Sequence, residues 1–236
     1  MDRSLWAVLP VKSLQDAKQR LAGMLTARER LELFRAMLED VLSVLAASPG
    51  LAGILMVTGD ADARALGERY GARVLAAEDR GHTAASSLGA RTLAAEGMDG
   101  MVQVPADIPL VTPADIEALL DAHGLAPAVT LNPSRDQRGS NAVACSPPDL
   151  LPLRFGDDSF LPHLQRARAL GIEPQIVRRP GLALDIDTPD DLAAFCSAPS
   201  DTRAYAYLAE SGILERLAAR SADRSACCGH EARRKP

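Results

Sequence analysis

The chain alternates short apolar runs with longer segments whose apolar residues recur every three or four positions. The runs LWAVLPV (5–11), GILMVT (53–58) and MVQVPAD (101–107) are typical of strands buried on both faces. Residues 26–48 have the helical period and begin with a T-x-x-E capping box from Thr26 to Glu29. Repeated strand–helix units predict an α/β fold: an open, mostly parallel sheet flanked by helices, in a single domain over residues 1–220.

The remaining elements are predicted from the same patterns and from helix-capping residues. Strands are expected at 73–76, 127–133 and 141–146, with the last strands within 175–187. Helices are expected at 60–71, at 83–96, from Thr112 and Pro113 onward, at 158–171 with an early interruption by Pro162, at 188–195, and as one amphipathic helix at 202–221. The tail, residues 221–236, is expected to be disordered.

Composition and charge exclude several classes of function. The net charge of -5 and the aromatic content of 3% argue against a nucleic-acid or anionic-membrane partner. The chain has no run of 18 apolar residues, and an acid stands where a signal peptide needs an apolar region, so we expect a cytoplasmic protein. The cysteines have no metal-ligand or redox spacing and are expected to be reduced, and CCGH in the tail makes an incomplete metal site: Cys145, Cys196, Cys227 and Cys228.

Acidic residues stand where strands are expected to end. Asp107 closes the apolar run VQVPAD, and Asp185 and Asp187 flank Ile186 in LALDID. Residues two apart on an extended chain point to the same face, about 7 Å apart, and two such carboxylates favour a cation between or near them. The pattern therefore indicates a magnesium site with Asp107 as a third ligand. The alternative for Asp187 is that it caps the following helix beside Thr188.

A basic loop follows the first expected strand. PVKSLQDAKQRLAGML places Lys12, Lys18 and Arg20 within nine residues. Cations gathered at a strand exit of an acidic chain favour an anionic ligand, although neither a P-loop nor a G-x-G-x-x-G turn is present. The alternative is an ordinary solvated loop.

Hydroxyl residues form a third group of candidates. Ser140 follows Gly139 at an expected tight turn, and Ser159 precedes an expected helix, where backbone N–H groups can hold an anion. The alternatives are turn chemistry for Ser140 and helix capping for Ser159. His163 is more often a packed or surface histidine than a catalyst, so we assign it no chemical role.

Five segments in order, LPVKSLQDAKQRL, VPADIPL, GSNAV, FGDDSFLPHL and LDIDTPDDL, resemble the 2-phospho-L-lactate guanylyltransferase family over residues 5–217. The resemblance implies a GT-A-like nucleotidyltransferase fold and a cytoplasmic enzyme of coenzyme F-420 biosynthesis. Its substrates would be GTP and a small phosphorylated acid: 2-phospho-L-lactate, phosphoenolpyruvate or 3-phospho-D-glycerate. It also implies Mg²⁺ on Asp107, Asp185 and Asp187, and the acceptor on Ser140, Gly156 and Ser159, with Ser140 replacing a family threonine. A homodimer is compatible with it.

Two departures from the family pattern bear on specificity. The usual G-L-N-A-A-L reads GHTAAS here, so His82 and Thr83 replace leucine and asparagine at an expected nucleotide-binding loop. Asp157 and Asp158 add negative charge beside the expected acceptor site. Each departure bears on guanine preference or on the choice of acceptor.

The resemblance implies in-line transfer, in which an acceptor phosphate oxygen attacks the α-phosphorus and pyrophosphate leaves. Lys12 and Asp107 would act at the reacting phosphates, with Lys18 and Arg20 offsetting further charge. Two alternatives stay open: another GT-A-like nucleotidyltransferase of molybdopterin or sugar-phosphate type, and a non-catalytic nucleotide-binding regulator. PVKSLQDAKQRL lacks the glycine-rich loop expected of the first, and retention of all three aspartates argues against the second.

Overall fold

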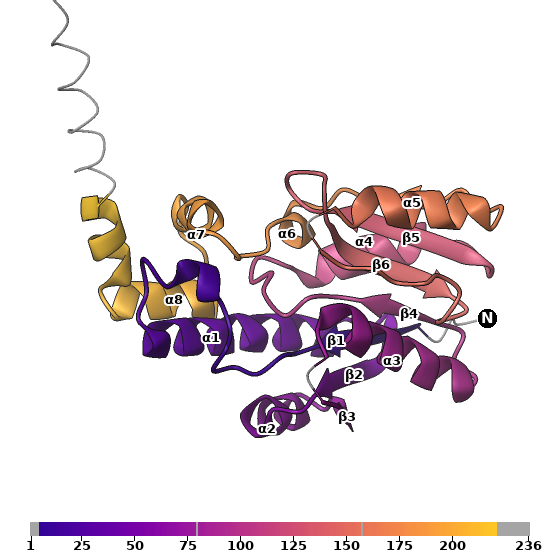
Figure 1. The fold of residues 1–236 in the computed structure, drawn as a ribbon, viewed down its shortest axis with the longest axis horizontal. Coiled ribbons are helices and arrows are strands. Elements are labelled where there is room, and N and C mark those ends of the chain that lie inside the picture. The colour runs from indigo at the N-terminus through magenta and orange to yellow at the C-terminus, as the bar shows by residue number, and fades with distance from the viewer. Residues whose placement is uncertain (1–4, 79, 157, 221–236) are drawn as a thin grey trace, which may run out of the picture.

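A computed structural model describes residues 5–78, 80–156 and 158–220 of the chain (Figure 1). The strands are β1 (Leu5–Pro10), β2 (Leu51–Thr58), β3 (Arg73–Ala76), β4 (Gly100–Gln103), β5 (Ala128–Pro133), β6 (Ser140–Ser146) and β7 (Gln175–Ile176). The helices are η1 (Gln19–Leu21, a 3-10 turn), α1 (Ala27–Ala46), α2 (Ala61–Arg69), α3 (His82–Ala95), α4 (Pro113–Ala122), α5 (Phe160–Ala169), α6 (Pro180–Ala183), α7 (Pro189–Cys196) and α8 (Arg203–Glu210). Residues 213–220 are also helical.

The strands form one 7-stranded sheet in the order β3-β2-β1-β4-β6-β5-β7. The pairs β1–β2, β1–β4, β2–β3 and β5–β7 are parallel. Strand β6 runs antiparallel to both of its neighbours, β4 and β5. The mostly parallel open sheet predicted from the sequence is therefore confirmed, with β6 as a reversed strand inside it. This reversal brings the first residue of β6 to the edge where β1, β2 and β4 end.

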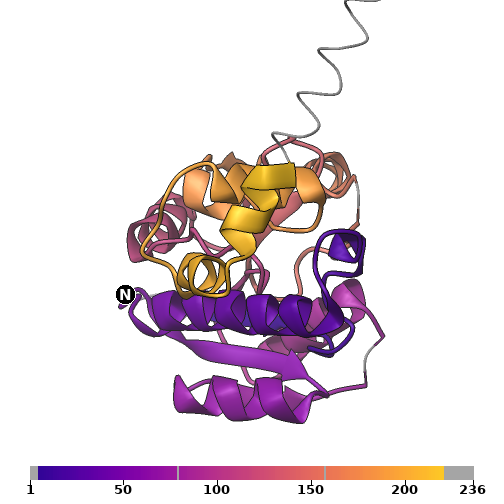
Figure 2. The same ribbon diagram turned by 90° about the vertical axis from the view of Figure 1, so that its left-hand side faces the viewer.

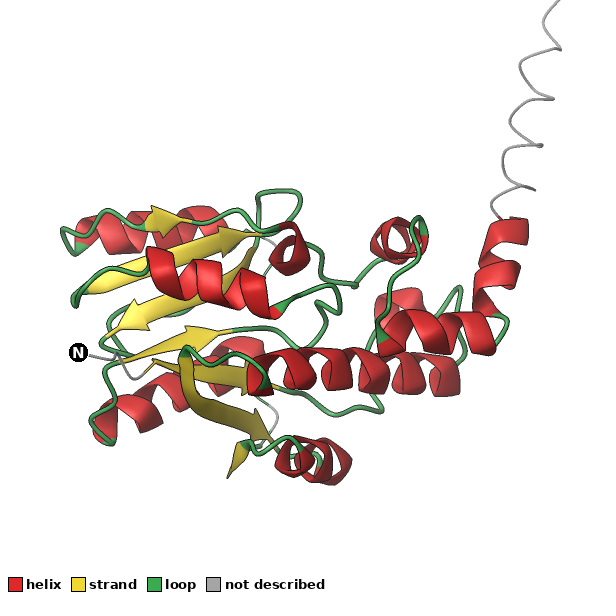
Figure 3. Ribbon diagram, turned by 180° about the vertical axis from the view of Figure 1, so that it is seen from behind, coloured by secondary structure: helices red, strands yellow, loops and turns green. Residues whose placement is uncertain are grey.

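Helices cover both faces of the sheet, as the two opposite views show (Figures 1 and 3). Strand β1 faces both cores in alternation, with Ala7 and Leu9 in one and Val8 in the other. The first core also contains side chains of α1, α2, α4, α7 and α8, and the second those of α3 and α5. Burial of both faces explains why these strands read as continuous apolar runs.

Capping residues fix where the helices begin. Thr26, Thr112 and Thr188 each form a capping box, with Glu29, Asp115 and Asp191 respectively as the acidic partners. Asp60 accepts the backbone N–H groups of Asp62 and Ala63 at the start of α2. The starts predicted for α1, α2, α4 and α7 are confirmed. Asp190 and Asp191 lie in the first turn of α7.

Helix α8 packs against the long helix α1 (Figure 2). The buried Asp40 of α1 accepts the backbone N–H groups of Arg203 and Ala204 at 2.8 and 2.9 Å, which satisfies the first turn of α8. Farther along, the Arg216 guanidinium donates to both carboxylate oxygens of Glu29 at 2.8 and 2.9 Å. The C-terminal helices are thus bound to α1 at Glu29, in its first turn, and at Asp40, farther along the helix.

Several predicted elements differ in the structure. Helix α5 is continuous, because Pro162 lies in its first turn, where a missing N–H costs nothing. Of the predicted strands within 175–187, only the two residues of β7 join the sheet; α6 and an irregular segment follow. The single helix predicted at 202–221 breaks at Gly212, whose φ of 69° suits glycine. The tail predicted to be disordered lies outside the described residues.

Within the described part of the chain, no helix combines the length and apolar character that crossing a bilayer requires. Cys145 is buried and Cys196 partly buried, and both are free thiols. Cys227 and Cys228 lie outside the described residues.

Candidate active site

A pocket of about 860 Å³ lies at the sheet edge where β1 and β4 end and β6 begins. A second pocket of about 580 Å³ adjoins it along the loops that follow β1, β2 and β3. Both pockets are lined by Pro10, Lys12, Arg80, Gly81 and His82. The structure gathers nearly all of the predicted site residues around the first pocket: Lys12, Arg20, His82, Thr83, Asp107, Ser140, Gly156, Ser159, Asp185 and Asp187.

Lys18 lies beneath this pocket, with a side chain that is 1% exposed. Its Nζ atom is 2.5 Å from Asp107 Oδ2 and 2.7 Å from Asp187 Oδ1. It also lies 5.6 Å from the centroid of the Phe34 ring of α1. Burial alone would lower the pKa of Lys18, but the two carboxylates outweigh burial and raise it. The ammonium therefore stays charged, and for Lys18 the structure excludes the alternative of a solvated loop residue.

The aspartates come from two segments that are joined by a backbone hydrogen bond. Asp107 lies four residues beyond the end of β4, and its carbonyl accepts the N–H of Ile186 at 3.0 Å. Ile186 is fully buried, so Asp185 and Asp187 on either side of it are held at the pocket. Both line the same pocket as the alternation argument predicts, although they lie in an irregular segment and not in a strand.

The carboxyl groups of Asp185 and Asp187 have different partners. Asp185 Oδ1 accepts a hydrogen bond from Asn141 Nδ2 at 3.0 Å, and burial together with the charge of Asp107 raises the pKa of Asp185 to about 6. Burial also acts to raise the pKa of Asp187, but the Lys18 ammonium outweighs it and the pKa is lowered. Thr188, not Asp187, caps α7. The capping alternative for Asp187 is therefore wrong.

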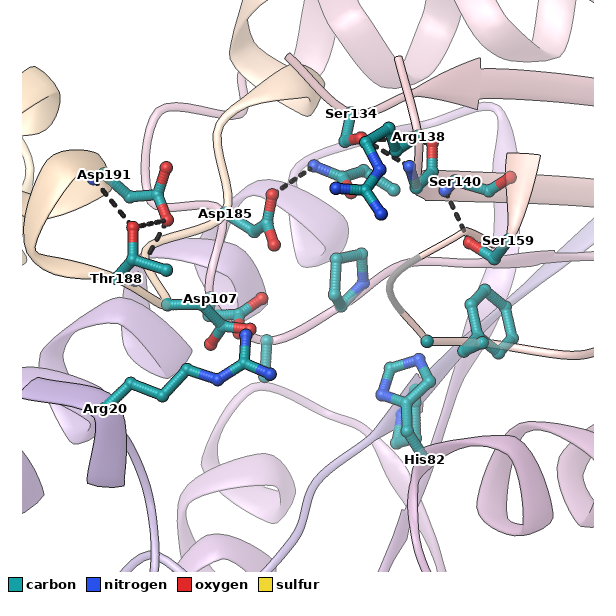
Figure 4. A pocket seen from close by; sticks show the side chains of 18 of the residues that line it. Arg20, His82, Asp107, Ser134, Arg138, Ser140, Ser159, Asp185, Thr188 and Asp191 are labelled. Carbon is teal, nitrogen blue, oxygen red and sulfur yellow. Dashed lines mark hydrogen bonds between the residues drawn. The ribbon is translucent and has the colours of Figure 1, made fainter. Parts of the chain in front are cut away.

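Within the described residues, no three His, Cys, Asp or Glu side chains are grouped closely enough to form a metal-ligand set. The Lys18 ammonium instead lies between two of the three predicted ligands. Asp107, Asp185 and Arg20 lie on one side of the pocket, and Ser140 and Ser159 on the other (Figure 4). The site thus has an acidic side around a buried cation and a hydroxyl side across the pocket.

The basic loop is held by an aspartate of the next strand–helix unit. Asp60 Oδ2 accepts the N–H of Leu14 at 3.0 Å, while Oδ1 caps α2. This bond fixes the loop between Lys12, which lines both pockets, and Lys18, which is buried. Lys12 and Arg20 are exposed at the pocket.

The two serines are connected by hydrogen bonds. Ser159 Oγ accepts the backbone N–H of Ser140 at 2.8 Å, and no side-chain cap is formed at the start of α5. Ser140 Oγ lies 3.0 Å from Nδ1 of His163. Both serines are buried, and Ser140 begins a strand. The alternatives of helix capping for Ser159 and of a turn at Ser140 are therefore wrong.

Thr83 anchors the loop that contains Gly156. Its Oγ1 accepts the N–H of Phe155 at 2.9 Å. The Phe155 ring packs edge-on against His82, with the centroids 4.6 Å apart, and His82 Nε2 lies 3.1 Å from Gln103 Nε2. Gly156 follows with a φ of 148°, which favours glycine. His82 and Thr83, the residues that depart from the family pattern, thus connect α3 to the loop that contains Gly156.

Asp158 does not leave an uncompensated charge near the pocket. Its carboxylate accepts hydrogen bonds from Arg138 Nε and Nη2 at 2.9 and 3.2 Å. Asp157 lies outside the described residues. The Arg138 guanidinium therefore pairs with the carboxylate of Asp158, which is one of the two acids expected to bear on the choice of acceptor.

His163 and Asn141 were not predicted from the sequence to contribute to the site. Both residues lie inside segments that resemble the family, FGDDSFLPHL and GSNAV. Spacing within FGDDSFLPHL offers one signal for His163: it follows Ser159 by four residues, which on a helix places the two residues on one face.

The family described as "Guanylyl transferase CofC like" matches residues 5–227. A phosphoenolpyruvate guanylyltransferase of Rubrobacter xylanophilus is 38% identical over 80% of this chain and 92% of that protein. A 3-phospho-D-glycerate guanylyltransferase of Colwellia psychrerythraea is 34% identical over 81% and 92%. A 2-phospho-L-lactate guanylyltransferase of Methanothermobacter thermautotrophicus is 32% identical over 86% and 88%.

Solved structures share the fold. A protein of Desulfovibrio desulfuricans G20 assigned to the nucleotide-diphospho-sugar transferases superposes with a TM-score of 0.74 at 18% identity, covering 91% of this chain and 98% of that chain. Glucosyl-3-phosphoglycerate synthase of Mycobacterium tuberculosis, in complex with Mn²⁺, uridine diphosphate and phosphoglyceric acid, gives 0.55 at 16% identity over 84% and 80%. These likenesses confirm the GT-A-like fold.

Proposed function

The chain belongs to the family of CofC-like guanylyl transferases, and from this membership we propose that it transfers the guanylyl group of GTP to a phosphorylated three-carbon acid, in coenzyme F-420 biosynthesis. The observation that carries the proposal is the pairing of Lys18 with Asp107 and Asp187, opposite Ser140 and Ser159. On one side of the pocket this arrangement can neutralise the charge of reacting phosphates, and on the other side its hydroxyl groups can donate hydrogen bonds to an anion.

Asp107, Asp185 and Asp187 are not grouped as a ligand set in this structure, but carboxylate oxygens are the ligands that a hard divalent cation prefers. Asp107 and Asp187 already share one positive charge, whereas burial and the charge of Asp107 raise the pKa of Asp185. Mg²⁺ held by these three carboxylates would supply neutralisation of phosphate oxygens. The Mn²⁺ complex of the glucosyl-3-phosphoglycerate synthase supports divalent-metal use on this fold.

We assign the second pocket to the nucleoside of GTP. It is formed by the loops after β1, β2 and β3, and ligands of open α/β sheets bind beyond the carboxyl ends of strands. Lys12 lines both pockets and would face the triphosphate where it passes from one to the other. Lys18 and Arg20 would balance charge at the α-phosphate end, and His82 and Thr83 would border the nucleotide.

We assign the far side of the first pocket to the acceptor. Ser140, Gly156 and Ser159 would hold the phospho-acid so that a phosphate oxygen points at the α-phosphorus of GTP. That oxygen forms the new bond as the bond from the α-phosphorus to the bridging oxygen of the β-phosphate breaks, and pyrophosphate leaves. The attacking phosphate is already anionic, so positioning and charge neutralisation are what the residues supply.

A turnover assay tests the proposal. The protein is incubated with GTP, Mg²⁺ and, in separate reactions, phosphoenolpyruvate, 2-phospho-L-lactate or 3-phospho-D-glycerate, and pyrophosphate and the guanylylated acid are measured. Relatives named for these three acids match at 38%, 32% and 34% identity, so experiment and not likeness assigns the acid. We expect GTP- and acid-dependent pyrophosphate release with at least one acid.

The same assay separates the alternatives. GTP binding without pyrophosphate release for any acid would indicate a nucleotide-binding regulator. Release only in further reactions in which a sugar phosphate or molybdopterin replaces the acid would indicate the other nucleotidyltransferase classes. Family membership favours guanylyl transfer over both of these outcomes.

A further inference from the structure

His163 is fully buried on α5, and its ring contacts two of the segments that form the proposed acceptor site. Its Nε2 lies 3.0 Å from the backbone nitrogen of Arg154, and its Nδ1 lies 3.0 Å from Ser140 Oγ. A backbone N–H can only donate, so Nε2 must be the unprotonated nitrogen that accepts. In a neutral ring the proton then lies on Nδ1, which donates to Ser140 Oγ.

The surroundings keep this ring neutral. Burial, with a further contribution from the charge of Arg166, lowers the pKa of His163 to about 4. The ring packs edge-on against Phe155 at 5.2 Å between centroids. At neutral pH the histidine therefore holds one protonation state and one direction of hydrogen bonding.

The direction of this bond decides what Ser140 can offer a ligand. A hydroxyl has one proton to donate and two lone pairs to accept with. Ser140 Oγ accepts from His163, and within the described part of the chain it makes no other hydrogen bond, so its own proton is available to the pocket. An anion is the ligand that such a donor suits.

His163 also connects the other two residues that we assign to the acceptor. Its backbone N–H donates to the carbonyl of Ser159 at 3.1 Å, one helical turn earlier. Through Arg154 it fixes the start of the loop that leads to Gly156. One side chain and its own backbone thus hold the three acceptor-binding segments in register.

We propose that His163 is a positioning residue for the acceptor: it orients the Ser140 hydroxyl toward an anionic oxygen of the phospho-acid and holds the loop of Gly156 beside it. The proposal rests on the proposed function, because it takes the acceptor to be an anion at Ser140. It assigns His163 no contact with the reacting atoms.

Two substitutions separate the hydrogen bonds of the ring. The amide of asparagine reaches the position of Nδ1, so His163→Asn retains a donor to Ser140. The amide of glutamine reaches the position of Nε2, so His163→Gln retains an acceptor for Arg154 and loses the donor. We expect His163→Gln to raise the acceptor KM roughly tenfold with the GTP KM unchanged, and His163→Asn to recover most of that loss.

His123 provides a matched control. It is buried, its Nδ1 lies 2.9 Å from Thr130 Oγ1 and its Nε2 lies 3.0 Å from Ser146 Oγ, yet it lines neither pocket. His123→Gln should lower the melting temperature without changing the acceptor KM. If both variants change the acceptor KM equally, His163 is a packing residue and the positioning role is overturned.

A double variant and a spectrum complete the test. In a Ser140→Ala background, His163→Gln should raise the acceptor KM no further, because the oriented hydroxyl is already absent. Ring ¹⁵N chemical shifts of the unmodified protein should show Nδ1 protonated, and a protonated Nε2 would overturn the proposal without any variant having to fold. An acceptor KM unaffected by Ser140→Ala would instead overturn the acceptor assignment, while a KM raised by Ser140→Ala but not by His163→Gln overturns only the role of His163.

Discussion

Asp185 and Asp187 lie two residues apart on one segment, yet the pKa values of their carboxyl groups shift in opposite directions. The Asp187 carboxylate contacts the Lys18 ammonium, whereas the Asp185 carboxyl group has a neutral amide as its partner and Asp107 as a nearby charge. A negative charge on Asp187 therefore stabilises the folded protein, whereas a negative charge on Asp185 destabilises it.

The first prediction concerns Asp185 without divalent metal. Its folded pKa of about 6 lies above the ordinary value of 3.8, so the folded state binds the extra proton and stability falls as pH rises between these values. Asp185→Asn keeps an oxygen for Asn141 and removes the charge. It should raise the free energy of unfolding at pH 7.5 by about 2 kcal/mol, less than the full linkage value because the side chain is partly exposed.

Chemical denaturation in EDTA at pH 4 and pH 7.5 checks this expectation. The gain should be much smaller at pH 4, where the folded carboxyl group is protonated and the unfolded one is only about half ionised. Asp187→Asn should act in the opposite sense, since its lowered pKa contributes stability above 3.8 that is lost as pH falls through the folded pKa. Equal effects of the two substitutions at pH 7.5 would show that the opposing shifts are wrong.

A second prediction concerns Lys18. Lys18→Met leaves Asp107 and Asp187 facing each other without the ammonium, which should cost about 2–4 kcal/mol of stability in EDTA. Because ammonium and metal would compete for the same carboxylates, Mg²⁺ should raise the melting temperature of Lys18→Met more than that of the unmodified protein. Turnover should be lost in the variant.

Thermal melts over a Mg²⁺ titration measure this difference, with the exposed Lys12→Met as the control. Identical Mg²⁺-induced shifts in the unmodified protein and in Lys18→Met would show that the metal binds elsewhere.

A third prediction concerns Lys12. Lys12→Ala should raise the GTP KM about tenfold and leave the acceptor KM unchanged, because the lost charge would face the triphosphate. Lys12→Arg should recover only part of the loss, since a planar guanidinium does not replace a compact ammonium. Stability should change by less than about 0.5 kcal/mol at this exposed position. Unchanged steady-state kinetics at low GTP would leave Lys12 as a solvated residue.

A fourth prediction concerns Ser159. Ser159→Ala leaves the buried N–H of Ser140 without its acceptor, which should cost about 1–2 kcal/mol of stability. It should also raise the acceptor KM roughly ten- to a hundredfold with little change for GTP. Thr112→Ala, which removes a side chain that caps α4, is the control and should lower only stability. Matching kinetics in the two variants would return Ser159 to a purely structural role.

How much of this structure can be predicted from the sequence depends on whether the interacting residues are close together in the chain. The capping box at Thr26 was predicted because its partner, Glu29, lies three residues away. The pairing of Lys18 with Asp107 and Asp187 spans 89 and 169 positions, and no local pattern specifies which cation meets which acid. The family resemblance identified residues that the structure groups around one pocket. It implied that they are metal ligands and phosphate-binding cations, and it did not predict that they contact each other.

The same limit explains the misread elements. LDID has the alternation of a strand, but a strand also needs a neighbour with free backbone groups. Ile186 donates to the carbonyl of Asp107 and so joins a loop instead of the sheet. For His163 the spacing from Ser159 was the one local signal, because its two side-chain hydrogen-bond partners come from segments that only the fold brings together.

The reversed strand β6 divides the site into two parts with separate origins. Under the proposed function, the nucleotide is held by loops that leave parallel strands, whereas Ser140 enters from the opposite direction through the β5–β6 hairpin. Substitutions in that hairpin or in the Arg154–Ser159 connection can therefore alter the accepted acid while the nucleotide half keeps its shape. This separation is consistent with relatives that are named for three different acids. Exchanging the hairpin and the 154–159 connection between such relatives should exchange their acceptor preference without loss of GTP use.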